Sequence, residues 1–218
     1  MLPSRTPVGS NFDAAENNLT MRNWDERYSS ETYAYGTAPN EFLAANAEHL
    51  PPGRLLCLAD GEGRNGVWLA EQGFTVTSVD ASGVGLAKAR KLAESRGVTV
   101  ETVHADLGDY EIGSDTWDGI VSIFAHLPPE LRARVHQRCV AGLRPGGVML
   151  LEAYQPAQLD YGTGGPPSSE MMMTDRTLQE ELRGLEFLSL EEKEREVREG
   201  QYHTGLAAVV QMIARKPG

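Results

Sequence analysis

The sequence predicts an α/β protein with a doubly wound, mostly parallel sheet and a C-terminal antiparallel hairpin, layered as a three-layer sandwich. From residue 54 onward, short aliphatic runs alternate with amphipathic stretches, as strands and helices do in a parallel sheet. Two of the amphipathic stretches stop at a glycine directly before the next aliphatic run. Near the C-terminus two extended segments follow each other with no helical stretch between them, which predicts a hairpin.

Five aliphatic runs account for the parallel strands. Each has four to six residues, mostly β-branched or aliphatic, as expected for strands that are buried on both faces. Right-handed crossovers between successive runs then wind the chain over both faces of the sheet. The runs are residues 55–59, 74–79, 98–103, 119–124 and 148–151.

The remaining elements are helices between the runs and the two hairpin strands. The third helix opens after two prolines and spaces Leu131, Val135 and Cys139 four apart, which places them on one face. The charged run that precedes Gly200 is interpreted as the solvated outer face of a strand. We expect helices at residues 64–72, 83–96, 129–142 and 175–184, and hairpin strands at 185–197 and 204–214.

Composition and charge exclude several classes of protein. A length of 218 residues fits one domain with an ordinary core. The chain has 20 basic and 31 acidic side chains, and its net charge of −11 argues against a nucleic-acid partner, which is bound by neutralising phosphates. Apolar runs of five or six residues are far too short for the roughly 20 that span a bilayer. Cys57 and Cys139 fit neither a disulfide framework nor a zinc site, and we expect a cytoplasmic protein.

The first residues differ in composition from the rest. Residues 1–22 mix Pro, Ser, Gly and Asn with few apolar side chains and contain no signal-peptide core, so we expect a flexible N-terminal arm. Residues 23–218 then form the single folded domain.

A glycine-rich turn follows the first predicted strand. Gly61, Gly63 and Gly66 fit the pattern GxGxxG, and Asp80 ends the second strand 20 residues after Asp60. Glycines let the backbone turn sharply and approach a ligand, while the helix behind them presents free N–H groups. A carboxylate one strand later is placed to bind the hydroxyls of a ribose. The pattern therefore predicts a cofactor that contains a nucleoside.

Three further features favour S-adenosylmethionine over a dinucleotide. A short turn with Asp106 follows the third strand, where the carboxylate can accept the amino group of adenine. Residues 143–148, with the pair Gly146 and Gly147, return a helix tightly to the sheet. The third feature is the antiparallel hairpin. The literal GxGxxG keeps an NAD-dependent oxidoreductase open as an alternative.

With these motifs the chain resembles the class I S-adenosylmethionine-dependent methyltransferases, which have a Rossmann-like fold. Within that family it is similar to the branch of the tellurite-resistance and thiopurine S-methyltransferases. The resemblance extends from about residue 23 to 216 and includes two upstream segments, residues 24–28 and 35–40, that are similar to the segment closing over the cofactor. It implies that residues 23–50 act as a partial lid, that S-adenosylmethionine is the cofactor and that S-adenosylhomocysteine is the product.

The chain also departs from the family pattern. Cys57 stands where the family carries an acid and Ala59 where it carries a glycine, so Asp60 or Glu62 is the available substitute. Arg27 is a candidate for the cofactor carboxylate, because a guanidinium suits bidentate pairing. The residues expected to bind the cofactor are Arg27, Ala59, Asp60, Gly61, Glu62, Gly63, Asn65, Asp80, Ala81, Asp106, Leu107 and Phe124.

The resemblance implies an in-line methyl transfer that needs no metal, and the sequence shows no metal-ligand cluster. We expect the acceptor to be a small, soft nucleophile, a thiol or chalcogen compound, which benefits from a nearby base. His203 and His126 are the candidates for that base. Thr204 stands where tellurite-type relatives have an arginine after the histidine, which weakens the case for an inorganic oxyanion. Tyr35, Tyr154 and Tyr161 are expected to shape the acceptor pocket.

The partner is therefore expected to be a small-molecule methyl acceptor, with no nucleic acid and no membrane, and the protein to be a monomer or homodimer. A non-catalytic module that only binds S-adenosylmethionine is the remaining alternative.

Overall fold

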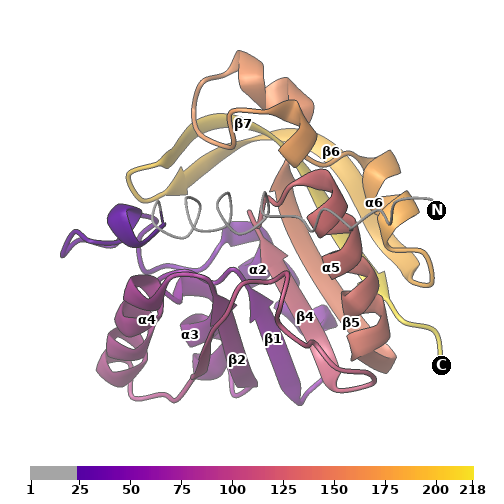
Figure 1. Cartoon of the computed structure of the whole chain (residues 1–218), viewed down its shortest axis with the longest axis horizontal. Helices are drawn as coiled ribbons and strands as arrows, with labels where there is room; N and C mark the ends of the chain where they lie inside the picture. The colour runs from indigo at the N-terminus through magenta and orange to yellow at the C-terminus, as the bar shows by residue number, and fades with distance from the viewer. Residues whose placement is uncertain (1–23) are drawn as a thin grey trace, which may run out of the picture.

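The computed structural model describes residues 24–218, so the predicted N-terminal arm lies outside the described residues. Seven strands form one sheet in the order β3-β2-β1-β4-β5-β7-β6 (Figure 1). Five of them are β1 (Arg54–Leu58), β2 (Thr75–Asp80), β3 (Glu101–His104), β4 (Trp117–Ile123) and β5 (Leu143–Tyr154).

The first five strands are parallel to one another, which confirms the predicted mostly parallel sheet. The chain order reverses beside β1, which lies between β2 and β4. In open α/β sheets ligands bind beyond the carboxyl ends of the strands at such a reversal. The connecting helices are α3 (Arg64–Glu71), α4 (Gly83–Ser95) and α5 (Pro129–Gly142), close to their predicted bounds.

The strands begin within two residues of their predicted starts except for β3 and β5. β3 starts at Glu101 instead of residue 98 and has only four residues. β5 starts at Leu143, before the glycine pair, because Leu143 pairs with Trp117 across a register shift and the regular ladder resumes at Val148. A side chain at Gly147 would lie 2.9 Å from the Arg144 carbonyl, so the bend between the two paired parts requires glycine there.

The end of the chain adds two long strands, β6 (Glu186–Glu199) and β7 (His203–Arg215), after α6 (Asp175–Glu181). β7 is antiparallel to both β5 and β6. The charged side chains of β6 alternate with residues of lower exposure, because β6 is the edge strand and one of its faces meets solvent.

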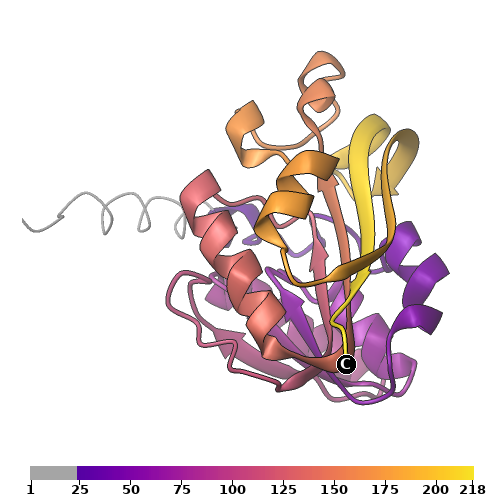
Figure 2. The same cartoon turned by 90° about the vertical axis from the view of Figure 1, so that its right-hand side faces the viewer.

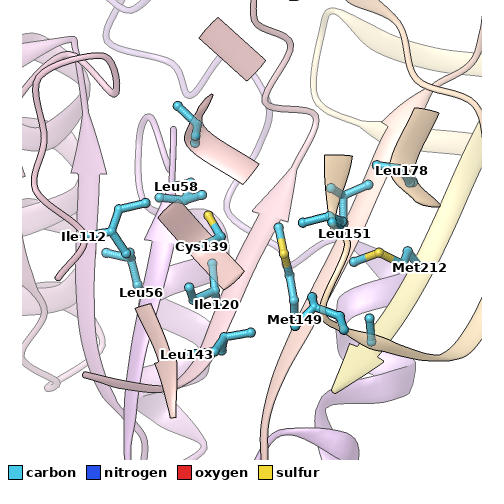
Figure 3. Packing of buried hydrophobic residues seen from close by; sticks show 14 of the residues in the cluster. Leu56, Leu58, Ile112, Ile120, Cys139, Leu143, Met149, Leu151, Leu178 and Met212 are labelled. Carbon is cyan, nitrogen blue, oxygen red and sulfur yellow. The ribbon is translucent and has the colours of Figure 1, made fainter. Parts of the chain in front are cut away.

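Helices cover both faces of the sheet (Figure 2). Leu56 and Leu58 of β1 belong to the core cluster beneath α5 and α6, whereas Leu55 and Cys57 belong to the cluster beneath α2 (Glu41–Asn46), α3 and α4. Alternate residues of a strand point to opposite faces, so β1 contributes to both clusters. Figure 3 shows part of the first cluster, in which Cys139 of α5 packs near Leu56, Leu58 and Ile120.

The short elements are 3-10 helices, η1 (Ala47–His49), η2 (Pro156–Asp160) and η3 (Ser169–Met171). A helical turn over residues 24–27 begins the described part of the chain. Within residues 24–218, every helix is too short or too polar to cross a membrane.

Candidate cofactor and acceptor site

The glycine-rich turn at the end of β1 has a left-handed backbone. Gly61 has a φ of 56° and Gly63 a φ of 84°, while Ala59 adopts 48°, which is unusual for a residue with a side chain. A side chain at Gly63 would lie 2.5 Å from the Ala89 Cβ, so α4 can pack this closely only against glycine. Strained backbone of this kind concentrates at functional sites.

Asp80 joins this turn to the end of β2. Its Oδ2 accepts a hydrogen bond from the Gly61 amide at 2.8 Å and its Oδ1 one from the Ser82 amide at 2.7 Å. Burial raises the pKa of Asp80, and the two amide hydrogen bonds oppose that shift. The carboxylate is therefore fixed beside the glycine turn, as the GxGxxG spacing predicts.

Asp60 binds both β2 of the sheet and the first turn of α3. It is buried, and its Oδ2 accepts from the Ser78 hydroxyl at 2.6 Å while its Oδ1 accepts from the Gly66 amide at 3.3 Å. Burial raises the pKa of Asp60 to about 7. The Gly66 amide belongs to the first turn of α3, so Asp60 has a structural partner at each oxygen.

Glu62 fastens the upstream segment to the site. Its Oε2 accepts from the Ala34 amide at 2.7 Å, and its Oε1 forms an ion pair with Lys88 of α4. The Lys88 ammonium also donates to the carbonyls of Ser30 at 2.8 Å and Thr32 at 2.7 Å. The predicted lid is thus held by a lysine and a glutamate that both come from the folded core.

Tyr28 lies over the glycine turn. A side chain at Gly61 would meet the Tyr28 hydroxyl at 2.6 Å, and one at Gly85 would meet its ring at 2.9 Å. The ring is 5% exposed and stacks on Trp24 with 5.6 Å between centroids. The upstream segment therefore covers the place where the backbone approach of a cofactor is predicted.

The turns after β2 and β3 are connected. His104 places its Nε2 2.9 Å from the Ala81 carbonyl oxygen. Asp106 accepts from the Gly108 amide at 2.6 Å, which forms an Asx turn, and Leu107 between them is buried. Ala81 and Asp106, both predicted cofactor contacts, thus lie on two linked turns at the same edge of the sheet.

An aromatic cluster surrounds His203 at the start of β7. The centroid of its ring lies 4.5 Å from that of Tyr35, 4.8 Å from that of Phe124 and 5.4 Å from that of Tyr154. Phe124, directly after β4, has a φ of 53°. The structure brings together three predicted residues from the lid and from the carboxyl ends of β4 and β5, with the predicted His203 at their centre.

His126 takes part in this cluster through the backbone. Its Nε2 accepts a hydrogen bond from the Tyr154 amide at 3.0 Å. Burial lowers the pKa of His126 to about 3, so the imidazole is neutral at physiological pH. The nitrogen that would act as a base is already engaged, and His126 positions the Tyr154 backbone.

A buried polar network connects the lid to the hairpin. Asn40 donates to Glu152 at 2.6 Å and to Glu199 at 2.7 Å. Arg195 makes two 2.7 Å hydrogen bonds to Glu152, and Arg64 donates to Glu199 at 2.6 Å. Asn40, Glu152 and Glu199 are each less than a tenth exposed, so the network is shielded from water.

Glu199 and His203 face each other across the hairpin turn, with 3.8 Å between Oε2 of Glu199 and Nδ1 of His203. Burial alone would raise the pKa of Glu199, but its contacts with His203, Arg64 and Arg195 outweigh burial and lower the pKa to about 2. Burial also lowers the pKa of His203, against the effect of Glu199. A permanent carboxylate therefore stands beside a largely neutral imidazole.

The remaining predicted residues have other contacts. The guanidinium of Arg27 lies 4.1 Å above the ring of Tyr202 on the surface. The Tyr161 hydroxyl donates to Glu194 of β6. The Asn65 side chain accepts from the Asn40 amide at 2.9 Å, which ties the lid to α3.

Sequence reasoning missed the network around Glu199. Arg64 stands next to the glycine motif, and Asn40 follows a proline in a segment already assigned to the lid, so both carried a weak positional signal. Glu199 had no such positional signal, because it is one of many acids in a charged run that is typical of the solvated face of a strand. Among residues 24–218 no group of three His, Cys, Asp or Glu side chains is placed to bind a metal ion.

The comparisons with known proteins find methyltransferases. Residues 55–147, from β1 to the glycine pair, match the family model described as a methyltransferase domain. An uncharacterized methyltransferase, YbaJ of Bacillus subtilis, is 31% identical over 111 residues, which are 50% of this chain and 44% of that protein. The 2-heptyl-1-hydroxyquinolin-4(1H)-one methyltransferase of Mycobacteroides abscessus is 30% identical over 63% of this chain and 63% of its own length. The chain thus spans about half to two thirds of these curated relatives.

Solved structures show the same fold at low sequence identity. One from a study of the conversion of a disulfide bond into a thioacetal group during echinomycin biosynthesis has a TM-score of 0.72 and 19% identity, covering 91% of this chain and 92% of the other. TehB of Haemophilus influenzae has a TM-score of 0.68 and 23% identity, covering 88% and 65%. A Burkholderia thailandensis N1-methyltransferase with bound S-adenosylhomocysteine has a TM-score of 0.66 and 20% identity, covering 99% and 94%.

The glycine turn and Asp80, the matched domain and these relatives lead to one assignment. Residues 55–147 match a methyltransferase domain, the curated relatives are methyltransferases, and the fold is also that of a methyltransferase solved with S-adenosylhomocysteine, so S-adenosylmethionine is the cofactor that these similarities support.

Proposed function

We propose that the whole chain transfers the methyl group of S-adenosylmethionine to a small molecule with a soft nucleophile, a thiol or chalcogen compound. One observation carries the proposal. The glycine turn with Asp80 and the aromatic cluster around His203 lie under the same upstream segment, because Glu62 binds Ala34 and the next residue, Tyr35, packs on His203.

The residues at the glycine turn fit the cofactor. Each Asp80 oxygen accepts one backbone hydrogen bond, and a carboxylate oxygen has a second lone pair for a ribose hydroxyl. Asp106 uses its Oδ1 in the Asx turn and has its other oxygen for the amino group of adenine. When bound, the cofactor supplies a methyl group activated by a sulfonium cation. The left-handed backbone at Gly61 and Gly63 forms the sharp turn that a close approach to a ligand requires.

His203 is the proposed base for the acceptor. Burial lowers its pKa, so the imidazole is available in its neutral form near pH 7. The His203 imidazole would accept the proton of the acceptor thiol, and the bound cofactor would supply its methyl group to the resulting thiolate and leave as S-adenosylhomocysteine. The rings of Tyr35, Phe124 and Tyr154 exclude water and orient the acceptor, which is the main task of the protein in this displacement.

Two further considerations support a thiol. Thr204 after His203 leaves no adjacent arginine for an inorganic oxyanion. The fold neighbour with a TM-score of 0.72 was solved in a study of a reaction at sulfur, the conversion of a disulfide bond into a thioacetal group. Cytoplasmic location, a monomeric or homodimeric state and the absence of a nucleic-acid partner stay predictions.

A planar aromatic hydroxyl compound is the second candidate acceptor. The three rings around His203 offer faces and edges on which a flat ring can pack. The Mycobacteroides abscessus relative is named for a hydroxyquinolone, a compound of that shape.

A panel of acceptors tests the proposal. The purified protein is incubated with S-adenosylmethionine and with small thiols, selenols, hydroxyquinolones or RNA, and release of S-adenosylhomocysteine is measured. We expect release with a thiol or selenol and none with RNA. Release only with the hydroxyquinolones would favour the second candidate, and thermal stabilisation by NAD but not by S-adenosylhomocysteine would contradict both.

A further inference from the structure

We infer that Arg64, the first residue of α3, binds the carboxylate at the methionine end of the cofactor. The inference rests on the assignment of S-adenosylmethionine as cofactor, and it replaces Arg27, which the sequence suggests for this role. It concerns the part of the site where Cys57 and Ala59 depart from the family pattern.

The guanidinium of Arg64 is buried but incompletely bonded. The residue is 8% exposed, and its Nη2 donates to Oε2 of Glu199 at 2.6 Å. Its Nη1 is buried and has no hydrogen-bond partner among residues 24–218. A buried donor of this kind costs free energy unless something accepts its hydrogen bond. The unpartnered Nη1 therefore indicates a bound acceptor that is not part of the folded chain.

The position of Arg64 indicates that this acceptor is an anion. Arg64 follows Gly63 directly and stands in the first turn of the eight-residue helix α3. The N-terminus of a helix carries a partial positive charge and attracts carboxylates and phosphates. The backbone of Arg64 thus follows the glycine turn directly, and its guanidinium lies against Glu199 of the hairpin.

The neighbouring charges leave Arg64 free for a second anion. Glu199 is shared, because Asn40 donates to it at 2.7 Å and Arg195 at 3.3 Å in addition to Arg64. Its pKa of about 2 shows that these contacts keep it ionised without help from a ligand. Arg64 uses Nη2 to bind Glu199, and Nη1 remains as a donor for a second acceptor, because a guanidinium carries five N–H groups.

The other cations considered for the carboxylate are either exposed or already paired. The guanidinium of Arg27 lies over Tyr202 at the surface, 4.1 Å from the centre of that ring. Lys88 is bound to Glu62 and to three carbonyl groups of the lid. Arg195 is saturated by Glu152, Glu199 and Glu41.

Calorimetry with two ligands tests the inference. S-adenosylhomocysteine contains the amino-acid end, whereas 5′-methylthioadenosine has the same adenosyl group and no carboxylate. We expect Arg64→Met to weaken binding of S-adenosylhomocysteine about 10- to 100-fold and to leave the affinity for 5′-methylthioadenosine unchanged. Arg64→Lys keeps the charge without the fork and should lose less.

Two matched variants separate this role from others. Arg195→Met removes the other guanidinium on Glu199, and we expect it to leave the ratio of the two affinities unchanged. Arg27→Met tests the residue that the sequence suggests, and we expect no selective loss. An equal loss for both ligands in Arg64→Met, or a selective loss in Arg27→Met, would overturn the inference. If folded wild-type protein binds neither ligand, the cofactor assignment fails instead.

Discussion

At the scale of single residues, the structure separates two histidines that the sequence treats alike. His126 accepts from the Tyr154 amide through Nε2 and has a pKa of about 3. His203 has a nitrogen 3.8 Å from Glu199 and lies inside a cluster of rings. His126 holds the Tyr154 backbone, whereas the His203 imidazole is available to take a proton from the methyl acceptor.

We therefore predict that His203→Asn lowers kcat/KM for a thiol acceptor by about 10²- to 10⁴-fold, the range expected for loss of a general base. Affinity for S-adenosylhomocysteine should stay within about twofold, because the substitution leaves the glycine turn and Asp80 intact. Rates above the pKa of the free thiol should recover, since hydroxide then supplies the thiolate. A variant that loses cofactor affinity and acceptor turnover equally would contradict the role of His203 as base.

Asp60 gives a prediction about stability. Burial raises its pKa from 3.8 to about 7. A carboxyl with a higher pKa in the folded than in the unfolded chain binds a proton on folding. Its contribution to the free energy of unfolding is therefore full below about pH 4 and is lost as the pH rises through 7.

In Asp60→Asn this titration is absent, while an oxygen remains to accept from Gly66. Relative to the variant, the wild-type protein should lose up to about 1.4 kcal/mol of unfolding free energy per pH unit between about pH 4 and 7. Urea denaturation of both proteins across that range measures the difference. Two curves that run parallel with pH would show that Asp60 ionises normally in the folded protein.

At the scale of elements, α4 fastens the upstream segment, which is the predicted lid, through one side chain. Lys88 forms an ion pair with Glu62 and donates to the carbonyls of Ser30 and Thr32, and its ammonium lies 4.8 Å from the centre of the Tyr33 ring. The two carbonyl contacts join residues that are 58 and 56 positions apart in the chain, so they hold a segment that has few bonds of its own.

Lys88→Met should release this segment without unfolding the sheet. We expect amide hydrogen exchange of residues 28–34 to accelerate about 10- to 100-fold, because the charged hydrogen bonds that close the lid are lost. Exchange in β4 and β5 should not change. Lys91→Met is the control, since Lys91 is exposed on the same helix. Equal acceleration in both variants would mean that the charge of α4, and not the contacts of Lys88, holds the lid.

The elements themselves follow closely from local sequence, and their exceptions have local causes. The helix from Pro129 to Gly142 has its predicted bounds, because prolines open it and the chain leaves it for the sheet at Leu143. The extension of β5 back to Leu143 could not be predicted, since it depends on pairing with Trp117 across a bulge. Strand pairing of that kind is a property of two segments and not of one.

At the scale of the whole molecule, the site divides into a part that the sequence predicts and a part that it hides. Gly61, Gly63 and Asp80 were predicted because a short turn and one strand length set their spacing. Glu199 was not, because its partners Arg64 and Asn40 are 135 and 159 residues away. A charged residue in a sequence can be a solvated acid or a buried acid with distant partners. Glu199 is of the second kind because the hairpin packs against the predicted lid and α3, and this packing cannot be predicted from charge alone.

This buried network should make the lid, the sheet and the hairpin unfold together. Glu152 of β5 is fully buried, and Arg195 of β6 and Asn40 of the lid both bind it. Removing the Glu152 carboxylate takes two hydrogen bonds from Arg195 and one from the buried Asn40, and leaves Arg195 with Glu199 and Glu41 only. We expect Glu152→Ala to lower the free energy of unfolding by about 3–5 kcal/mol.

Glu186→Ala is the matched control, because Glu186 also pairs with an arginine at 2.7 Å, the same N–O distance as in the Glu152 pair. That pair is about half exposed, so its loss should cost no more than about 1 kcal/mol. Urea denaturation followed by tryptophan fluorescence and by circular dichroism measures both variants, and coincident transitions show that the elements unfold as one unit. Similar small losses in the two variants would mean that water reaches Glu152 and that the lid and hairpin are held by packing alone, since a solvated carboxylate is removed at little cost wherever it lies in the fold.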